Sequence, residues 1–242
     1  MLGAAVLTAT AALKSGAGLI TLFSPPEIYS IIAPMLPPEI MVRLSLSPLT
    51  MLEQNFDAIV LGPGIGTPDS NLANQLLAVV ERSSIPIVLD ADMLNLIARE
   101  EKLSSLHPKC ILTPHPGEMQ RLFPSSESRE KIALNFCELY PVTLLFKGAR
   151  TIITEPNKVL YVNSTGTPAM ATAGQGDVLS GLIGGLCAQG YTPLDATKLS
   201  AWLAGEAAQL ALASQTETEE TLSASSVIHF LPQAFLAVAR QA

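Results

Sequence analysis

A glycine-rich stretch that ends in an aspartate, Ala173-Gly174-Gln175-Gly176-Asp177, directly precedes a long apolar segment. We expect that segment to form a helix, whose first N–H groups lack partners and whose dipole is positive at this end. Such a helix start favours the binding of an anion such as a phosphate. Asp177 could then take the proton of a hydroxyl that attacks a phosphoryl group. The alternative is that Asp177 is only an acidic residue favoured by the helix dipole.

Two further loops each follow a short apolar run. Gly62-Pro63-Gly64-Ile65-Gly66 follows a run that ends at Leu61, and Thr113-Pro114-His115-Pro116-Gly117-Glu118 follows Cys110–Leu112. Open α/β sheets bind ligands beyond the carboxyl ends of their strands, so we expect both loops, and the His115 imidazole, at that edge. The first loop lacks the spacing of a dinucleotide fingerprint. A plain turn, or a rigid turn with a solvated histidine, would also explain these patterns.

Charged residues lie at two other strand ends. Lys147-Gly148-Ala149-Arg150-Thr151 joins two predicted strands and would place a cation where a nucleotide phosphate could bind. A hairpin with a solvated lysine is the alternative. Asp90-Ala91-Asp92 could hold Mg²⁺ through water, or Asp92 could cap the following helix. We expect Asp90 to lie near the site.

The elements that must position these residues alternate between strand and helix character. Short continuous apolar runs indicate strands buried on both faces, as in a parallel sheet covered by helices. The sequence therefore predicts a single doubly wound α/β layer sandwich with a helical C-terminal third. We expect strands at 18–23, 39–45, 58–61, 85–89, 110–112, 143–146, 151–153 and 159–162, and helices at 3–15, 71–82, 93–99, 128–140, 177–189, 193–213 and 226–240.

Composition narrows the class of protein. Apolar residues make up 48% of the chain, which excludes disorder, while glycine and proline interrupt every apolar stretch before it reaches the length of a membrane span. The net charge is −7 and no basic cluster is present, so a small-molecule partner is expected rather than nucleic acid or a membrane. Only 14% of residues are charged, which favours a homo-oligomer. Cys110, Cys137 and Cys187 lack metal spacing and are expected to be reduced core residues of a cytoplasmic protein.

Taken in order, these motifs resemble the ADP/ATP-dependent NAD(P)H-hydrate dehydratase family of the ribokinase-like superfamily. The resemblance runs from Gly3 nearly to the C-terminus. It rests on Gly3–Leu7, Ser15–Leu19, Gly62–Gly66, Leu89–Leu96, Thr113–Glu118, Lys147–Ala149, and Asn163–Gly166 leading through Pro168, Met170, Ala171 and Thr172 to Gly176 and Asp177.

The resemblance implies a ribokinase-like three-layer sandwich that repairs damaged nicotinamide cofactor. A hydrated NADH or NADPH would be phosphorylated on its added hydroxyl by ADP or ATP, with Mg²⁺ bridging phosphates, and phosphate would then leave. By the same resemblance Asp177 would be the base, and the amides of Gly174, Gln175 and Gly176 the anion hole. Nucleotide contacts would come from Lys147, Gly148, Ala149, Arg150, Thr151 and Gly176. The hydrate pocket would include Ala4, Gly64, His115 and Asp177. The homo-oligomer would be a tetramer.

The chain also departs from the family pattern. Thr167 replaces a usual Asn, Ala169 and Ala173 replace usual glycines, and Gln175 places a long side chain beside the anion hole. The family's opening strand and its glycine-rich turn are not seen, so we expect residues 1–242 to form one domain truncated at its N-terminus. Lost strand pairing should reduce solubility or activity. The alternatives are a ribokinase-like kinase of a small vitamin precursor and a catalytically weak nucleotide-binding subunit.

Overall fold

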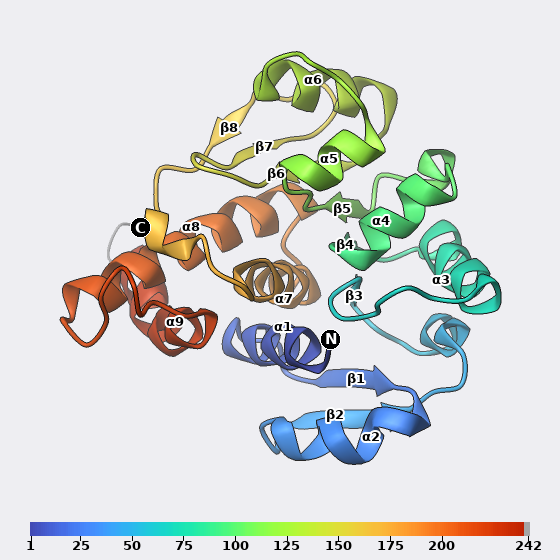
Figure 1. Cartoon of the computed structure of the whole chain (residues 1–242), viewed down its shortest axis with the longest axis horizontal. Helices are drawn as coiled ribbons and strands as arrows, with labels where there is room; N and C mark the ends of the chain where they lie inside the picture. Colours follow the sequence, from blue (N-terminus) through green and yellow to red (C-terminus); the bar gives the residue numbers. More distant parts are fainter. Residues whose placement is uncertain (240–242) are drawn as a thin grey trace.

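The main sheet of the computed structural model, which describes residues 1–239, contains six strands (Figure 1). Their spatial order, β3-β4-β5-β6-β7-β8, follows the chain. The first four strands are parallel, whereas β7 and β8 are antiparallel to their neighbours. This confirms a mostly parallel central sheet. The bounds are β3 (Ile59–Leu61), β4 (Ile87–Leu89), β5 (Cys110–Leu112), β6 (Thr143–Phe146), β7 (Ile152–Thr154) and β8 (Tyr161–Val162).

Two further strands form a separate parallel pair, β1 (Ile20–Ser24) with β2 (Ile40–Leu44). Within residues 1–239 no ladder joins β1 to β3. The lining of a cavity of about 580 Å³ includes all of β1, Ile20–Ser24, and residues 58–61, which contain β3. The expected layer sandwich is thus present, with its sheet divided into two parts.

Helices cover both faces of the main sheet (Figure 1). Helices α3 to α6 lie on one face, and α1, α7, α8 and α9 lie on the other. The bounds are α1 (Leu2–Lys14), α2 (Pro26–Ile32), α3 (Ser70–Arg82), α4 (Asp92–Arg99), α5 (Pro116–Leu122), α6 (Arg129–Leu139), α7 (Gln175–Ala188), α8 (Pro193–Ala213) and α9 (Ala224–Ala239). Within residues 1–239 no helix combines the length and apolarity needed to cross a membrane.

Two helices, α2 and α5, were absent from the sequence prediction. Each has seven residues and begins at a proline. A helix of only two turns is too short to show the helical period of apolar residues. Proline, moreover, is as typical of a loop turn as of the first residue of a helix. The sequence also predicted the start of α7 at Asp177, whereas the helix begins two residues earlier, at Gln175.

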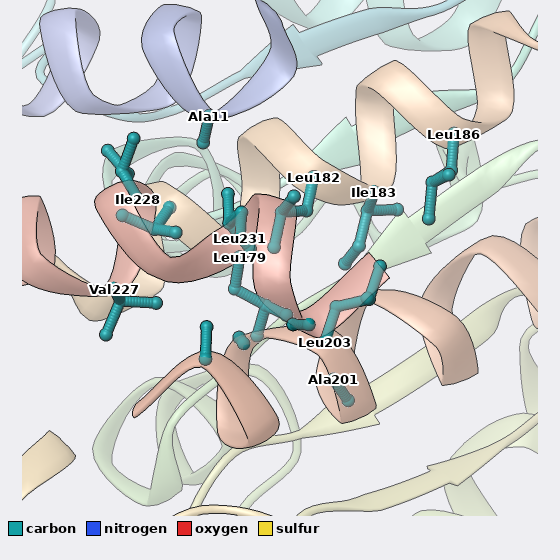
Figure 2. Packing of buried hydrophobic residues seen from close by; sticks show 14 of the residues in the cluster. Ala11, Leu179, Leu182, Ile183, Leu186, Ala201, Leu203, Val227, Ile228 and Leu231 are labelled. Carbon is teal, nitrogen blue, oxygen red and sulfur yellow. The ribbon is translucent and has the colours of Figure 1, made fainter. Parts of the chain in front are cut away.

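The buried strands explain the continuous apolar runs. In β5, Cys110 and Leu112 join the core under α3 to α6, while Ile111 faces the core under α7 and α8. Successive side chains of a strand point to opposite faces, so a strand covered on both sides must be apolar throughout. Figure 2 shows the core on the α7 and α8 side of the sheet, where Leu182 and Ile183 of α7 meet Leu203 of α8 and Leu231 of α9. All three cysteines are buried and free, as expected of core residues.

Helix α7 packs against α1 through glycines. A Cβ added at Gly181 would overlap the carbonyl oxygen of Thr8, and one added at Gly185 would overlap the Ser15 hydroxyl. The two backbones can approach only because both positions lack a side chain. This contact fixes α7, and with it Asp177, relative to α1.

We expect Gly181→Ala to lower the free energy of unfolding by about 1–3 kcal/mol, because the added methyl overpacks a backbone contact. Gly3→Ala in α1 is the matched control, since nothing lies within 4 Å of its added Cβ. That change should be neutral or stabilising by up to about 1 kcal/mol, as expected for alanine in a helix. Urea unfolding of both variants measures the difference; equal effects would contradict close packing at Gly181.

Candidate functional site

The candidate site lies where three neighbouring strands end. Asp90 follows β4, His115 follows β5 by three residues, and Lys147 directly follows β6. These strands are parallel and adjacent, so their carboxyl ends share one edge. This is the edge at which the sequence predicted ligand binding, and the first turn of α7 reaches it: a Cβ at Gly176 would lie 3.2 Å from Lys147 Nζ.

A buried ion pair forms the centre of the site. Lys147 Nζ donates to Asp90 Oδ1 at 2.7 Å, and the two side chains are 19% and 2% exposed. The other carboxylate oxygen, Oδ2, accepts a 2.8 Å hydrogen bond from the Ser180 hydroxyl of α7. Asp90 therefore ties β6 and α7 to the end of β4. The expected position of Asp90 near the site agrees with this geometry, and Lys147 is not a solvated hairpin lysine.

His115 begins helix α5 as its N-cap. Its Nδ1 accepts from the N–H groups of Gly117 and Glu118, at 3.0 and 3.3 Å, and Glu118 Oε2 accepts from the His115 N–H at 2.8 Å. These bonds are a capping box with histidine in the usual place of serine or threonine. The His115 side chain is 51% exposed, and its Nε2 lies 3.5 Å from Glu118 Oε1.

Glu118 and Ser180 take part in the site although the sequence analysis gave them no role. Glu118 is buried, and its Oε2 lies 3.8 Å from Lys147 Nζ. The sequence feature that indicates Glu118 is its position three residues after the N-cap, which is the spacing of a capping box. Ser180 is fully buried in the apolar run of α7. A single polar residue in such a run indicates a buried hydrogen bond, because buried polar groups normally have partners.

The start of α7 provides the anion-binding features. Gly174 is the N-cap with φ of 91°, a backbone conformation that favours glycine. The first intrahelical bond runs from Val178 N–H to the Gly174 carbonyl. The amides of Gln175, Gly176 and Asp177 consequently have no partner inside the helix. Two of the three predicted anion-hole amides lie in this first turn, and Gly174 directly precedes it.

Asp177 occupies the third position of α7. Burial raises the pKa of its carboxyl to about 6; the negative charge of Asp90 adds to this effect, and Lys147 opposes it. Within residues 1–239 the carboxylate accepts no hydrogen bond, and the N-cap role falls to Gly174 instead. Because a base works best with a pKa near the working pH, these properties favour proton transfer over capping.

Gln175 does not extend freely over the helix start. Its side-chain Nε2 donates to Thr172 Oγ1 at 3.4 Å, so the side chain turns back toward the preceding loop. Ala169 and Ala173, which replace usual glycines, both have negative φ and so fit alanine without backbone strain. These departures from the family pattern leave the backbone of the anion-binding turn intact.

The 147–151 loop is a hairpin whose backbone is held by the side chain of Arg129. Gly148 has φ of 144° and Arg150 has φ of 55°, which produces the tight bend. Arg129 of α6 donates to the carbonyls of Phe146, Lys147 and Ala149, at 2.9, 3.1 and 3.0 Å. Nothing local in the sequence pointed to Arg129, because its partners lie 17–20 residues away. The loop is thus rigidly placed beside Asp90.

The glycine turn 62–66 joins the start of α1 to the same edge. The Met1 amine donates to the Gly64 carbonyl at 2.8 Å, and the Gly66 N–H donates to Asp92 Oδ2 at 2.7 Å. Ala4, in the first turn of α1, is buried. The structure excludes the alternative that Asp92 caps the next helix: α4 begins at Asp92 and its N-cap is Ala91, while the Asp92 carboxylate supports the glycine turn instead.

Neither a metal cage nor the 580 Å³ cavity coincides with this site. Within the described part of the chain, no group of three His, Cys, Asp or Glu side chains could hold a metal ion. The 580 Å³ cavity includes Gly64 in its lining but not His115, Lys147 or Asp177. The ligand edge is therefore defined by the strand ends and α7 rather than by that cavity.

The fold and the site together define an α/β protein of the ribokinase-like class. A solved ribokinase-like superfamily protein of Enterococcus faecalis has a similar fold, with a TM-score of 0.81 and 26% identity over 97% of this chain and 82% of that one. Within this class the chain belongs to the NAD(P)H-hydrate dehydratase family, whose sequence model matches residues 1–230.

Individual relatives agree with this assignment. The chain is 38% identical to the bifunctional NAD(P)H-hydrate repair enzyme Nnr of Moorella thermoacetica, and it is 35% identical to the ADP-dependent (S)-NAD(P)H-hydrate dehydratase of Neisseria meningitidis. The matches cover 95% and 87% of this chain, but 46% and 73% of those proteins. The chain thus spans less than half of the bifunctional relative. The ADP/ATP-dependent dehydratase of Bacillus subtilis, co-crystallised with ATP/Mg²⁺, gives a TM-score of 0.82 at 29% identity, covering 98% and 85% of the two chains.

We expect Lys147→Met to lower the free energy of unfolding by about 3–5 kcal/mol, because it leaves the buried Asp90 carboxylate without its cation. Adding Asp90→Asn should restore most of that loss, since no charge then remains buried without a partner. Chemical denaturation of the two single variants and the double variant gives the coupling energy. Additive losses would mean that the ion pair does not hold the site together.

Proposed function

We propose that this protein uses ADP or ATP to dehydrate hydrated NADH or NADPH and so restores the reduced cofactor. One observation carries this proposal: a partly buried carboxyl with a pKa of about 6, Asp177, stands at a helix start whose amides are free to bind phosphate. Membership of the NAD(P)H-hydrate dehydratase family supports the choice of substrate.

The first step is transfer of a phosphoryl group. The Asp177 carboxylate accepts the proton of the hydrate's hydroxyl as that oxygen attacks the terminal phosphorus of the nucleotide. The bond to the bridging oxygen breaks, and its electron pair leaves with the nucleotide. The amides of the first α7 turn face the charge that develops on the transferred group, which is the main stabilisation such a transition state needs.

The second step is elimination of phosphate. The electron pair of the ring nitrogen expels phosphate from the adjacent carbon, and the next ring carbon loses a proton to form the double bond. The products are inorganic phosphate and the reduced dihydropyridine. The amides that stabilised the transferring phosphoryl group are in place for the leaving phosphate as well, because both anions occupy the same helix start.

The nucleotide is assigned to Lys147 and the 148–151 hairpin. Lys147 Nζ already lies against the first turn of α7, and it needs only to add a phosphate oxygen to its present carboxylate partners. Arg129 fixes the hairpin backbone, so Gly148 to Thr151 present a preformed surface to the nucleotide. Gly176 admits the close approach because it has no side chain.

The hydrate is assigned to the part of the sheet edge that lies beside the 62–66 turn and His115. Gly64 and the start of α1, including Ala4, border it on one side, and the half-exposed imidazole of His115 borders it on the other. The Asp90 network links these two sides through Lys147 and Glu118. In this placement the transferred phosphorus would lie between the hydrate hydroxyl and the leaving nucleotide, as an in-line transfer requires, with Asp177 beside that hydroxyl.

Mg²⁺ would be held chiefly by the nucleotide phosphates. It commonly keeps several waters and takes only one or two protein carboxylates, so the lack of a three-residue cage in the described chain fits this arrangement. When bound, the ion neutralises phosphate charge. Each oxygen of Asp90 accepts one hydrogen bond and keeps a further acceptor site, which a water bound to the ion could use.

We expect Asp177→Asn to lower kcat by about 10²- to 10⁴-fold with little change in nucleotide binding, because the amide keeps the shape but cannot accept the proton. In the unchanged protein, kcat/KM should rise with pH through about 6 and then level off, since only the ionised carboxyl is a base. The assay follows nicotinamide absorbance and phosphate release with NADH hydrate and ADP. Near-normal turnover of the variant would reject Asp177 as the base; phosphorylation without phosphate release would indicate a small-molecule kinase instead.

We expect loss of the Lys147 cation to weaken ADP binding by about 10- to 100-fold, as for a charged hydrogen bond to phosphate, with a smaller effect on the hydrate. The comparison uses the double variant Lys147→Met with Asp90→Asn, which leaves no buried charge without a partner. Asp90→Asn alone is the matched control. Calorimetric titration of each ligand separately provides the readout, and equal losses for ADP and hydrate would place Lys147 outside the nucleotide site.

A further inference from the structure

Arg129 is a cation held by backbone carbonyls and one aromatic ring. It is the first residue of α6, which packs on β6 and β7 (Figure 1). Its guanidinium donates to the carbonyls of Phe146, Lys147 and Ala149, and its central carbon lies 4.8 Å from the centroid of the Phe146 ring. Within residues 1–239 it forms no ion pair, and its Nε is buried without a hydrogen-bond partner. No acidic side chain of this region therefore neutralises the charge of Arg129.

The carbonyls bound by Arg129 decide where the following amides point. In a trans peptide the C=O of one residue and the N–H of the next point in opposite directions, and every peptide bond of residues 1–239 is trans. Because the Lys147 carbonyl is turned toward Arg129, the Gly148 N–H points away from it. The Ala149 carbonyl is bound in the same way, so the Arg150 N–H also points away from Arg129. We call these two N–H groups, of Gly148 and Arg150, the amide face of the hairpin.

The backbone of Lys147 shows what lies on the side opposite Arg129. The Phe146 carbonyl is the third one bound by Arg129, so the Lys147 N–H points away as well, and it donates to the Pro114 carbonyl at 2.8 Å. Pro114 directly precedes His115 in the loop that follows β5. The direction away from Arg129 is therefore the direction of the candidate site.

The N–H groups of the amide face are available to a ligand. Gly148 and Arg150 are exposed, and within residues 1–239 neither N–H has a hydrogen-bond partner in the protein. Neighbouring N–H groups that point to one side of a turn are a known arrangement for binding anions. Charge favours the same ligand: Lys147 is already paired with Asp90, whereas the charge of Arg129 has no acidic partner.

Glycine at position 148 permits the contact between Arg129 and the hairpin. A Cβ added there would lie 3.0–3.1 Å from three atoms of the guanidinium, which is closer than ordinary van der Waals contact. The φ of 144° at Gly148 is also unfavourable for any residue with a side chain. Arg129 and Gly148 therefore act together to set the orientation of the hairpin backbone.

We propose that Arg129 is a positioning residue for nucleotide binding: it turns the amide face toward the site, where Gly148 and Arg150 donate to a phosphate of ADP. This inference rests on the proposed function, which assigns the nucleotide to the hairpin. Arg129 does not touch the nucleotide and acts through the backbone and through its uncompensated charge. Because the transferred phosphoryl group is held at α7, Arg129 should affect nucleotide affinity far more than the chemical step.

The first test compares two substitutions of Arg129 with a matched control. Methionine removes the charge and the hydrogen bonds, whereas lysine keeps the charge but lacks the planar fork of donors. Lys131→Met is the control, because Lys131 is a cation of the same helix that is 70% exposed and pairs only with Glu127, at 4.0 Å. We expect Arg129→Met to raise Kd and KM for ADP about 10-fold or more while kcat at saturating ADP changes by less than about threefold.

Arg129→Lys should lie between the unchanged protein and Arg129→Met, and Lys131→Met should match the unchanged protein. A loss of kcat as large as the loss of ADP affinity would mean that Arg129 only supports the fold, and it would overturn the proposal. An equal loss of affinity in Lys131→Met would overturn it as well, because any cation of α6 would then suffice.

The second test uses the unchanged protein and so does not depend on the folding of a variant. ADP is titrated into the protein while the NMR signals of its backbone amides are followed. We expect the Gly148 and Arg150 signals to shift in proportion to the bound ADP and their hydrogen exchange to slow. Asn157, in the turn between β7 and β8, serves as the control and should not respond. Gly148 and Arg150 signals that stay unchanged at saturating ADP would overturn the proposal.

Turnover of NADH hydrate with ADP is measured on the same samples. Turnover without a response of Gly148 and Arg150 would reject the role of Arg129 and leave the proposed function standing. A response of both amides and the expected loss of ADP affinity, without any turnover, would reject the proposed function and leave the role of Arg129 supported. A protein that binds no ADP would reject both.

Discussion

The ion pair between Lys147 and Asp90 is the interaction on which the site depends. A carboxylate that is 2% exposed is stable only with a close cation and further hydrogen bonds, and Lys147 and Ser180 supply both. Because these partners come from β6 and α7, satisfying one buried charge fixes the strand ends and the helix start together. The polar network is thus as much a part of the architecture as the apolar cores on either face of the sheet.

The same network sets the chemistry of Asp177. Burial and the nearby charge of Asp90 both disfavour ionisation of this second carboxyl, and Lys147 only partly compensates, so its pKa rises to about 6. A carboxyl with that pKa is ionised at neutral pH and is a stronger base than an exposed aspartate. The helix start beside it offers amides to phosphate. In the proposed function, one arrangement of charges therefore prepares both the proton acceptor and the anion site.

Much of the architecture could be predicted because local patterns determine it. The strand Cys110–Leu112 and the helix Pro193–Ala213 were predicted with their observed bounds, since one is a continuous apolar run and the other begins with Thr and Pro. The site motifs were found because they follow strand ends. The contacts of Lys147 with Asp90 and of Arg129 with the hairpin could not be predicted, because they join residues 57 and 17–20 positions apart. Pairing of this kind depends on the complete fold.

In the proposed function, burial at this sheet edge turns Asp177 into a base. The most direct measurement is a carboxyl-carbon NMR titration of Asp177 in the unchanged protein and in Asp90→Asn. We predict a pKa near 6 that falls when the Asp90 charge is removed, because that charge disfavours ionisation. A titration near 4, the value of an exposed aspartate, in both proteins would contradict the account.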